Sequence, residues 1–309
     1  GVTFPPVSLP RVSIAIPVYN GMPYLKEAIE SVLGQSFGDL ELILADNASS
    51  DGTEACCREF AERDARVRYF RHPENLGAAA NFNFCVGQAR GEFFKWAASD
   101  DVCAPDWIAE SVAALDAAGP GTILAFPRVQ WIDEASGDLE KYGEGLPWTG
   151  GEAHDRLRSL LADPVDSHLF KCSPVCGVMR LDVLRTTGLI GSFGGSDKVT
   201  LVELALRGKW VEVPGYHFRR RVHQASSLAA NSTPEQVQHW FNPNAKQKFP
   251  MPRVTLFRGF LAAIRKAPLS RAERWRCLRV LTRFFRSEWR VLGGEYKIKV
   301  REALGLRRA

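Results

Sequence analysis

Two adjacent carboxylates give the sharpest chemical signal in this sequence. Asp100 and Asp101 follow a predicted strand at 92–96. Neighbouring carboxylates repel each other, and a hard divalent cation with oxygen ligands relieves that repulsion. Such a cation also stabilises the charge of a departing nucleoside diphosphate. The pair therefore predicts a Mn²⁺ or Mg²⁺ site, against the alternative of a solvated loop.

Two more polar clusters follow predicted strands. The strand at 12–18 continues into Tyr19 and Asn20, and the strand at 42–45 precedes the acidic and amide residues of 46–53. A single Asp or Asn in such a place is usually a turn former or a helix cap. Ligands of parallel α/β sheets bind beyond the carboxyl ends of the strands, so the convergence of three clusters predicts a binding site there.

The elements that must position these clusters alternate regularly. Apolar runs and helical spacing predict strands at 12–18, 42–45, 67–71 and 92–96, with helices at 25–33, 51–63 and 77–89. A strand, a helix and a second strand within about 35 residues favour a parallel pair. The fold class is therefore α/β, with a mostly parallel sheet flanked by helices. Beyond residue 120 we expect strands at 122–133, 175–180 and 210–222 and helices at 152–162 and 197–207.

Two common phosphate-binding motifs are absent from the sequence. No Gly-x-x-x-x-Gly-Lys-Ser/Thr loop occurs, and no Gly-x-Gly-x-x-Gly follows the first strand. These absences exclude a P-loop enzyme and a typical dinucleotide-binding protein.

The motifs, in their order, resemble family 2 glycosyltransferases of the GT-A fold. The matching pieces are 17–21, 35–37, 41–53, 75–77 with Asn81, and 99–101. The resemblance is strong over 11–110 and thinner to about 230. It implies a metal-dependent, inverting transfer of a sugar from a nucleotide-diphospho-sugar, by resemblance UDP-linked, to a hydroxyl of a glycan, a lipid-linked glycan or a small molecule.

The resemblance also implies roles for individual residues. The segment Pro17, Val18, Tyr19 and Asn20 would contact the nucleotide, and Asp46 would hydrogen-bond its base. The nucleotide pocket would be lined by Asp51, Asn75, Gly77 and Asn81. Asp101, with Asp100 beside it, would hold the metal and the donor sugar. Many relatives carry a further acid at the place of Ala98, so metal binding here also needs a ligand from elsewhere.

Two candidates lie in the second half of the chain. Asp197 precedes a predicted helix where family members place the catalytic base, which removes the proton of the acceptor hydroxyl. The alternative is that Asp197 only caps the helix. His223 follows three arginines, at a place where relatives often have a histidine that reaches the metal or the diphosphate. A structural or exposed histidine is the alternative.

Two other functions remain open at this stage. A nucleotidyltransferase also uses a nucleotide pocket and metal carboxylates, but it usually needs a Gly-rich triphosphate loop early in the chain. A carbohydrate-binding protein that has lost catalysis would keep the same fold.

Charge is distributed unevenly along the 309 residues. The chain has a net charge of +5, yet 253–309 holds 16 Lys and Arg against four Asp and Glu. Apolar residues at helical spacing in this segment predict basic amphipathic helices. They could dock on an anionic membrane surface, or they could cap the catalytic domain. No nucleic-acid-binding module is recognisable.

Four regions are expected. They are a flexible leader at 1–10, a catalytic domain at 11–230 with a nucleotide-sugar half (11–110) and an acceptor half (111–230), a linker at 231–252, and a basic helical extension at 253–309. Seven cysteines, an odd number, favour reduced thiols and a cytoplasmic protein. The extension would place it peripherally on the inner face of the cell membrane.

Overall fold

The protein is described from a computed structural model, which covers residues 9–143, 150–162, 174–224, 226, 230–231, 233–244 and 251–303. Most of the predicted leader lies outside these residues. The first half forms β1 (Val12–Val18), α1 (Leu25–Leu33), β2 (Leu40–Asp46), α2 (Thr53–Arg63), β3 (Val67–Arg71), α3 (Ala78–Gln88), β4 (Phe93–Trp96), β5 (Val102–Cys103) and α4 (Trp107–Ala118). The predicted alternation of strands and helices is confirmed.

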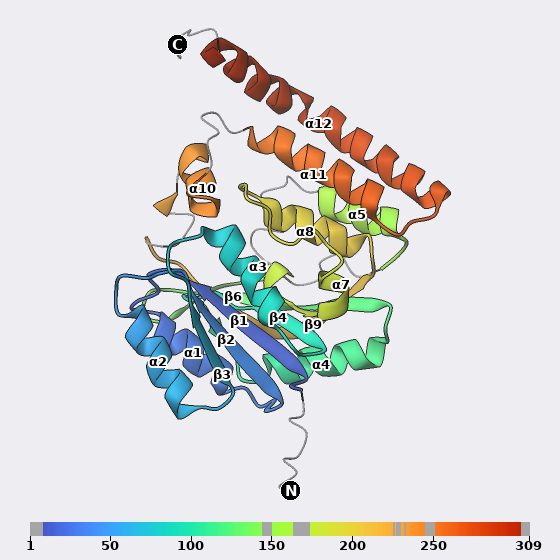
Figure 1. Cartoon of the computed structure of the whole chain (residues 1–309). Coiled ribbons are helices and arrows are strands. Elements are labelled where there is room, and N and C mark those ends of the chain that lie inside the picture. The colour runs from blue at the N-terminus through green and yellow to red at the C-terminus, as the bar shows by residue number, and fades with distance from the viewer. Residues whose placement is uncertain are drawn as a thin grey trace, which may run out of the picture.

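The second half adds the remaining elements, up to the long C-terminal helix. These are β6 (Thr122–Ile132), β7 (Asp138–Tyr142), α5 (Ala153–Ala162), the 3₁₀ turn η1 (Pro174–Cys176), β8 (Val178–Arg180), α7 (Leu181–Leu184), α8 (Ser196–Ala205), β9 (Lys209–Arg221), α10 (Pro234–Phe241), α11 (Pro252–Lys266) and α12 (Arg271–Ala303). Figure 1 shows the sheet with α8, α11 and α12 stacked on one side of it.

The strands form one mixed sheet in the order β3-β2-β1-β4-β8-β6-β9-β5, with β7 paired to β6. The first four strands are parallel, and β6 is parallel to β9. Strand β8 is antiparallel to both β4 and β6, so β6 and β9 run in the same direction as β1. The carboxyl ends of six strands therefore lie at one edge, where the polar clusters follow them.

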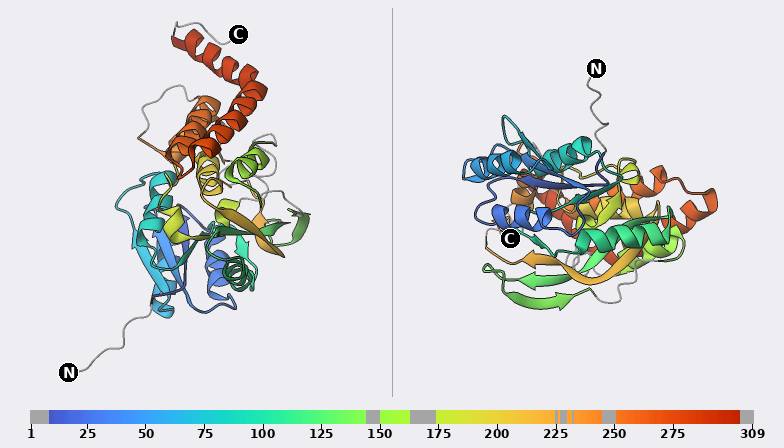
Figure 2. Two further views of the ribbon diagram at one scale, coloured as in Figure 1. Left: turned by 90° about the vertical axis from the view of Figure 1, so that its right-hand side faces the viewer. Right: turned by 90° about the horizontal axis from the view of Figure 1, so that it is seen from below.

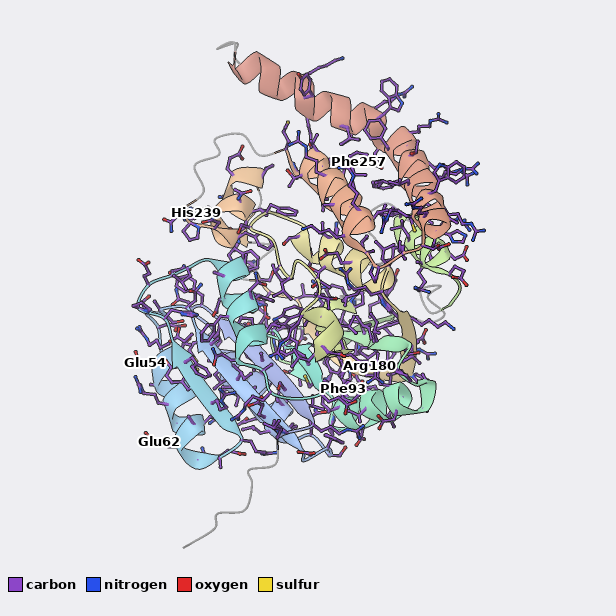
Figure 3. The ribbon with its side chains drawn as sticks, turned by 45° about the vertical axis from the view of Figure 1, so that its right-hand side comes forward. Glu54, Glu62, Phe93, Arg180, His239 and Phe257 are labelled. Carbon is purple, nitrogen blue, oxygen red and sulfur yellow. The ribbon has the colours of Figure 1, made fainter. Side chains whose placement is uncertain are left out.

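Burial explains why the central strands form. Every residue of β1 and β2 is buried, as expected for a strand covered on both faces. Strand β4 is next to β8 in the sheet, and Arg180 of β8 lies over the ring of Phe93 of β4 (Figure 3). The distance from the guanidinium carbon of Arg180 to the ring centroid is 5.2 Å.

The C-terminal helices share the same core. Leu256 and Phe260 of α11 and Cys277 and Leu281 of α12 are buried in one cluster with the sheet. Phe257 of α11 packs on Phe285 of α12, with ring centroids 4.9 Å apart. The two views of Figure 2 show α12 at the margin of the molecule. The apolar side of the extension therefore caps the domain, as one of its two predicted roles requires.

The segment predicted as a linker, 231–252, contains helix α10. Its N-cap is Thr233, whose hydroxyl accepts from the backbone N–H of Gln236, while the Gln236 side chain accepts from the backbone of Thr233. This capping box with Pro234 at the first helical position is a local signal for a helix start. The Asn, Pro and Gln content predicted a linker here, and the helix inside it was missed because this capping signal was given less weight than the composition.

Candidate active site

The two adjacent acids lie on the loop between β4 and β5, at the carboxyl edge of the sheet. This loop is clamped by Arg221 at the end of β9. The backbone N–H of Arg221 donates to Oδ1 of Asp101, and its Nε donates to the carbonyl oxygen of Asp100, both at 2.8 Å. A residue 120 positions away thus fixes the orientation of Asp101.

The Arg221 side chain is almost inaccessible, with 1% of its surface exposed. Its Nη1 donates to the carbonyl oxygens of Asp133 and Glu134 and to the hydroxyl of Ser136, and its Nη2 forms an ion pair with Glu27 at 2.5 Å. The guanidinium therefore joins α1, the β6–β7 turn and the acidic loop.

Sequence reasoning missed this role of Arg221. Three consecutive arginines were visible at 219–221, but neighbouring residues of a strand point to opposite faces. Which arginine turns inward depends on the pairing of β9 with β5, where Arg219 lies opposite Val102.

Burial dominates the electrostatics of Asp101. It raises the pKa of the carboxyl to about 7, and the neighbouring charge of Asp100 adds to the rise. The N–H of Arg221 and the charges of Arg220 and Lys95 oppose it. An acid that is costly to ionise alone is one that a bound cation would stabilise in its charged form.

Lys95 is a buried cation beside this acid that sequence reasoning also missed. Its side chain lies in the core with 1% exposure of the residue, and Nζ donates to the carbonyl oxygens of Trp96 (3.0 Å) and Cys176 (2.8 Å). The ammonium also lies 3.6 Å from the ring centroid of Trp107. Lys95 thus supplies positive charge beneath the acidic loop.

His223 lies next to the acid pair, as expected. Its Nε2 is 2.8 Å from Oδ2 of Asp100, and its ring packs on Tyr24 with centroids 4.7 Å apart. Among the described residues, no three His, Cys, Asp or Glu side chains are grouped to enclose a metal ion. Asp100, Asp101 and His223 therefore form no complete metal site by themselves, and a cation such as Mn²⁺ or Mg²⁺ beside them would need further ligands from a diphosphate and water.

The predicted nucleotide-binding segments, which follow β1 and β2, are joined to each other by hydrogen bonds. Pro17 and Val18 belong to β1, and the carbonyl oxygen of Val18 accepts from the backbone of Asn47 (2.8 Å). Beyond the strand, Tyr19 is 49% exposed. The backbone N–H of Asn20 donates to the Ser49 hydroxyl at 2.8 Å.

Asp51 organises the start of α2. It accepts from the backbone N–H groups of Met22 and Thr53, each at 3.0 Å. These hydrogen bonds, with that to the Thr53 hydroxyl, lower its pKa against the effect of partial burial. Tyr19, Asn20 and Asp51 are the exposed members of the predicted nucleotide site.

Asp46 is fully buried. Its Oδ1 accepts from the backbone N–H of Ser49 (2.8 Å), and its Oδ2 accepts from the hydroxyl of Tyr69 (2.9 Å) and pairs with Nε of Arg71 (3.3 Å). Arg71 is 32% exposed and also pairs with Glu54. A direct contact between Asp46 and a base stays a prediction, and in this arrangement it requires Arg71 to move.

Asn75 and Asn81 are also occupied inside the protein. The Asn75 side-chain oxygen accepts from Nδ2 of Asn47 and from the N–H of Gly77. Asn81 donates to the carbonyl oxygen of Ala45 at 2.7 Å and is 2% exposed. These amides hold the loop before α3 against the end of β2, so they shape the edge of the predicted pocket.

Asp197 lies in the first turn of α8. Burial raises its pKa, and the charges of Lys198 and Arg220 oppose that rise. The charge of Arg220 acts on Asp101 as well. Arg220 therefore opposes the rise in pKa of both acids, and a shared site for Asp101 and Asp197 stays a prediction.

Comparison with known proteins gives the family. The sequence profile of glycosyl transferase family 2 matches residues 13–188, more than half of the chain. An uncharacterised glycosyltransferase of Haemophilus influenzae is 31% identical over 184 residues, which are 59% of this chain and 55% of the relative. One of Rickettsia typhi is 32% identical over 130 residues, 42% of this chain and 40% of the relative. The chain thus spans about half the length of such relatives, or less.

Solved structures share the fold. The S. aureus protein TarS (residues 1–349), in complex with UDP-GlcNAc, is 15% identical, with a TM-score of 0.65 over 89% of this chain and 72% of that one. The mannosyltransferase PcManGT from Pyrobaculum calidifontis, in complex with GDP-Man and Mn²⁺, is 19% identical, with a TM-score of 0.52 over 97% and 82%.

The protein belongs to glycosyl transferase family 2 and has the GT-A fold. Members of this family are glycosyltransferases, and the family implies inversion at the anomeric carbon. Membership favours a glycosyltransferase over a nucleotidyltransferase.

Proposed function

We propose that the protein is a metal-dependent inverting glycosyltransferase with a UDP-linked donor and Asp197 as its catalytic base. The observation that supports the proposal is the acid pair at the carboxyl edge of the sheet, where Arg221 holds Asp101 and Asp100 and where Nε2 of His223 lies 2.8 Å from Oδ2 of Asp100. The raised pKa of Asp197 suits a general base, because a stronger base accepts a proton more readily once it is ionised.

Each of these residues would have its own role in the reaction. Asp197 removes the proton of the acceptor hydroxyl while its oxygen attacks the anomeric carbon. Tyr19, Asn20 and Asp51 bind the nucleotide, and Arg221 holds Asp100 and Asp101 in place. A bound cation supplies charge stabilisation for the departing diphosphate.

Two solved structures of the same fold support the cofactor and the donor. PcManGT carries Mn²⁺ with its nucleotide-sugar, and TarS carries UDP-GlcNAc. The acid pair and His223 are suited to the same kind of cation. The acceptor would be a hydroxyl on a glycan, a lipid-linked glycan or a small molecule, and the anionic membrane surface is the second proposed partner.

Nucleotide release from a panel of nucleotide-sugars tests the function. We expect slow, Mn²⁺- or Mg²⁺-dependent formation of free nucleoside diphosphate without an acceptor, and faster release with one. Asp197→Asn should lower sugar transfer by about 10² or more, the usual contribution of a general base, while donor binding persists.

The pH profile gives a second readout for Asp197. Since burial raises its pKa, the rate of transfer should fall on acidification at a pH above the usual range of an aspartate, and this limb should disappear in Asp197→Asn. An Asn variant with full activity would leave Asp197 as a helix-cap residue only.

A further inference from the structure

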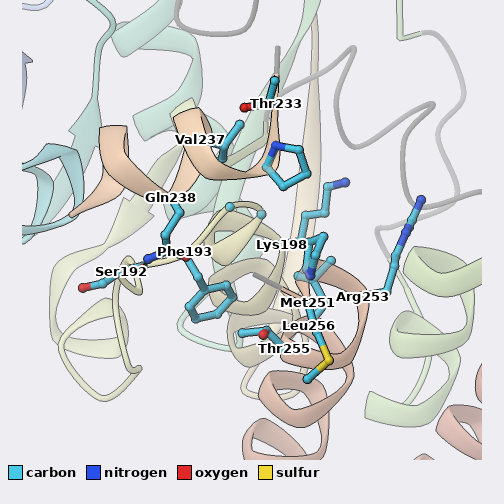
Figure 4. Close-up of a pocket in the computed structure, with 14 residues that line it drawn as sticks. Ser192, Phe193, Lys198, Thr233, Val237, Gln238, Met251, Arg253, Thr255 and Leu256 are labelled. Carbon is cyan, nitrogen blue, oxygen red and sulfur yellow. Dashed lines mark hydrogen bonds between the residues drawn. The ribbon is translucent and has the colours of Figure 1, made fainter. Parts of the chain in front are cut away.

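A cavity of about 700 Å³ lies between α8, α10 and α11, with Val237 and Leu256 among its lining side chains (Figure 4). Among the described residues that line it, none is Asp100, Asp101 or His223. The positions of these three side chains therefore depend on other contacts, and the start of α1 provides two of them.

Glu27 of α1 is the charged partner of the arginine that holds the acid pair. Its Oε2 forms an ion pair with Nη2 of Arg221 at 2.5 Å. Its Oε1 accepts from the hydroxyl of Ser136 at 2.6 Å, and that hydroxyl accepts from Nη1 of Arg221 at 3.0 Å. Each of the three side chains thus contacts the other two. Because the Arg221 side chain is buried, loss of its anionic partner would leave an uncompensated charge and favour a movement toward water.

Tyr24, three residues before Glu27, contacts the same arginine and the histidine of the site. Its ring centroid is 4.6 Å from the guanidinium carbon of Arg221 and 4.7 Å from the ring centroid of His223. Arg221 in turn donates to Asp101, and His223 lies against Asp100. Residues three apart are neighbours on a helix surface, so one patch of α1 supports both residues that contact the acid pair.

The start of α1 is itself held in place. The backbone N–H of Gly21 donates to the Thr53 hydroxyl at 2.9 Å, and that of Met22 donates to Asp51 at 3.0 Å. Four side chains of the helix are buried in the core, namely Leu25, Ala28, Ile29 and Val32. A helix anchored at its start and along one face can fix the side chains that it presents to the acidic loop.

We propose that Tyr24 and Glu27 are positioning residues of the predicted metal site. They act through Arg221 and His223, which hold the acidic loop in the arrangement that a cation needs. The inference rests on the proposed function, because it takes the acid pair as the group that meets the cation. It assigns to α1 a role in metal binding that no residue of α1 performs as a ligand.

Hydrogen exchange of the Arg221 amide tests this positioning without any metal. The amide donates to Asp101 at 2.8 Å, so its exchange reports opening of that contact. Loss of the ion pair in Glu27→Ala should speed this exchange, measured by NMR, by about tenfold or more. Glu27→Gln should lie between, because an amide oxygen can still accept from the guanidinium.

Glu30→Ala is the matched control. It removes an exposed carboxylate of the same helix, whose ion pair is with Lys26, and it should leave the exchange of the Arg221 amide unchanged. Amides of β1 report the stability of the whole fold. An equal acceleration in β1 and at Arg221 would show that Glu27 only stabilises the protein, and this would overturn the proposal.

The gain in UDP affinity on addition of Mn²⁺ tests the effect on the metal. Calorimetry gives the dissociation constant of UDP in excess Mn²⁺ and in EDTA, and the ratio of the two measures the coupling between metal and nucleotide. This ratio should fall by about tenfold in Glu27→Ala and by about threefold in Tyr24→Leu, while the affinity in EDTA stays the same. Tyr24→Phe keeps the ring and should keep the ratio.

The two measurements separate this inference from the function on which it rests. If UDP affinity of the unchanged protein ignores Mn²⁺ while exchange at Arg221 depends on Glu27, the metal-dependent function is contradicted and the role of Glu27 in fixing the loop is supported. If Mn²⁺ gives the same gain in the unchanged protein, Glu27→Ala and Glu30→Ala, the positioning role alone is contradicted. Equal exchange of the Arg221 amide in the two variants would contradict it as well.

Discussion

A hydrogen bond from Arg221 holds Asp101 in position, and burial is the main cause of its raised pKa. The backbone N–H of Arg221 donates to one carboxylate oxygen of Asp101. An amide side chain in this place can still accept the hydrogen bond through its oxygen, but it cannot carry the negative charge that a cation needs.

Asp101→Asn should therefore fold normally and lose turnover by about 10² or more, since charge stabilisation by a metal contributes several kcal/mol to the transition state. Chelation with EDTA should abolish the activity of the unchanged protein, and Mn²⁺ should restore it. Thermal unfolding of the variant checks the fold. Unaltered activity, either in the variant or in excess EDTA, would show that the metal assignment is wrong.

Asp46 binds Arg71 and Tyr69 inside the protein, and it is also predicted to bind the base of the nucleotide. Removal of its charge leaves the Arg71 guanidinium without that partner, so Asp46→Asn should lower the free energy of unfolding by about 1–3 kcal/mol. If the carboxylate also meets the base after Arg71 moves, the dissociation constant of the nucleotide should rise by about tenfold with little change in the rate of chemistry.

Calorimetry and urea unfolding measure these two effects of Asp46→Asn separately. Loss of stability with unchanged affinity for every nucleotide would restrict Asp46 to its internal role. Tyr69→Phe removes one internal hydrogen bond but keeps the carboxylate, and it provides the control.

At the scale of elements, helix α10 depends on a glycine far from it in sequence. Gly77 has a φ of +86°, and a Cβ there would lie 2.5 Å from the carbonyl oxygen of Phe241 and 2.6 Å from Pro243. The end of α10 thus rests directly on the turn before α3.

Gly77→Ala should lower the free energy of unfolding by about 1–2 kcal/mol from the left-handed backbone alone, and the overlap with Phe241 should displace α10. Urea unfolding measures the first effect, and hydrogen exchange of 234–241 measures the second. Gly87→Ala, in the same region of the chain and with open space around its Cβ, is the control that should not destabilise. Equal stability of both variants would contradict this account.

The sequence predicted the elements better than the contacts between them. The strand at 12–18 has the same bounds as β1 because a continuous apolar run is a local signal. The partners of Asp46 and Asn81 could not be predicted, because Tyr69, Arg71 and the carbonyl oxygen of Ala45 approach them only in the folded sheet. The resemblance suggested a nucleotide contact for both, and it could not show that they are enclosed.

At the scale of the whole molecule, helix α12 has two different faces. Cys277, Leu281 and Phe284 face the core. On another side of the helix, Trp275, Trp289 and Tyr296 are 57–64% exposed. Their spacings of 14 and 7 residues place these three on one side of a helix.

Arginines flank this aromatic side. The guanidinium of Arg279 lies over the ring of Trp275 and that of Arg290 over the ring of Trp289. Within the described residues, no helix is both long enough and apolar enough to cross a membrane. Exposed aromatic rings beside arginines match a helix that lies in the plane of an anionic membrane surface.

We therefore expect the protein to sediment with vesicles of anionic lipid at low salt and to leave them at high salt, because exposed charges are screened. Each basic side chain near such a surface contributes about 1 kcal/mol, so Arg286→Gln and Arg290→Gln together should weaken binding by about tenfold or more. Trp275→Ala with Trp289→Ala should weaken it as well. Point variants suit this test better than truncation, since α11 and part of α12 are buried in the core and their removal would expose it.

Val291→Ala is the matched control, because Val291 is 48% exposed but lies two residues from Trp289 and so faces a different direction. A protein that ignores anionic vesicles at every salt concentration would leave α12 with its packing role alone, and the transferase function would stand unchanged.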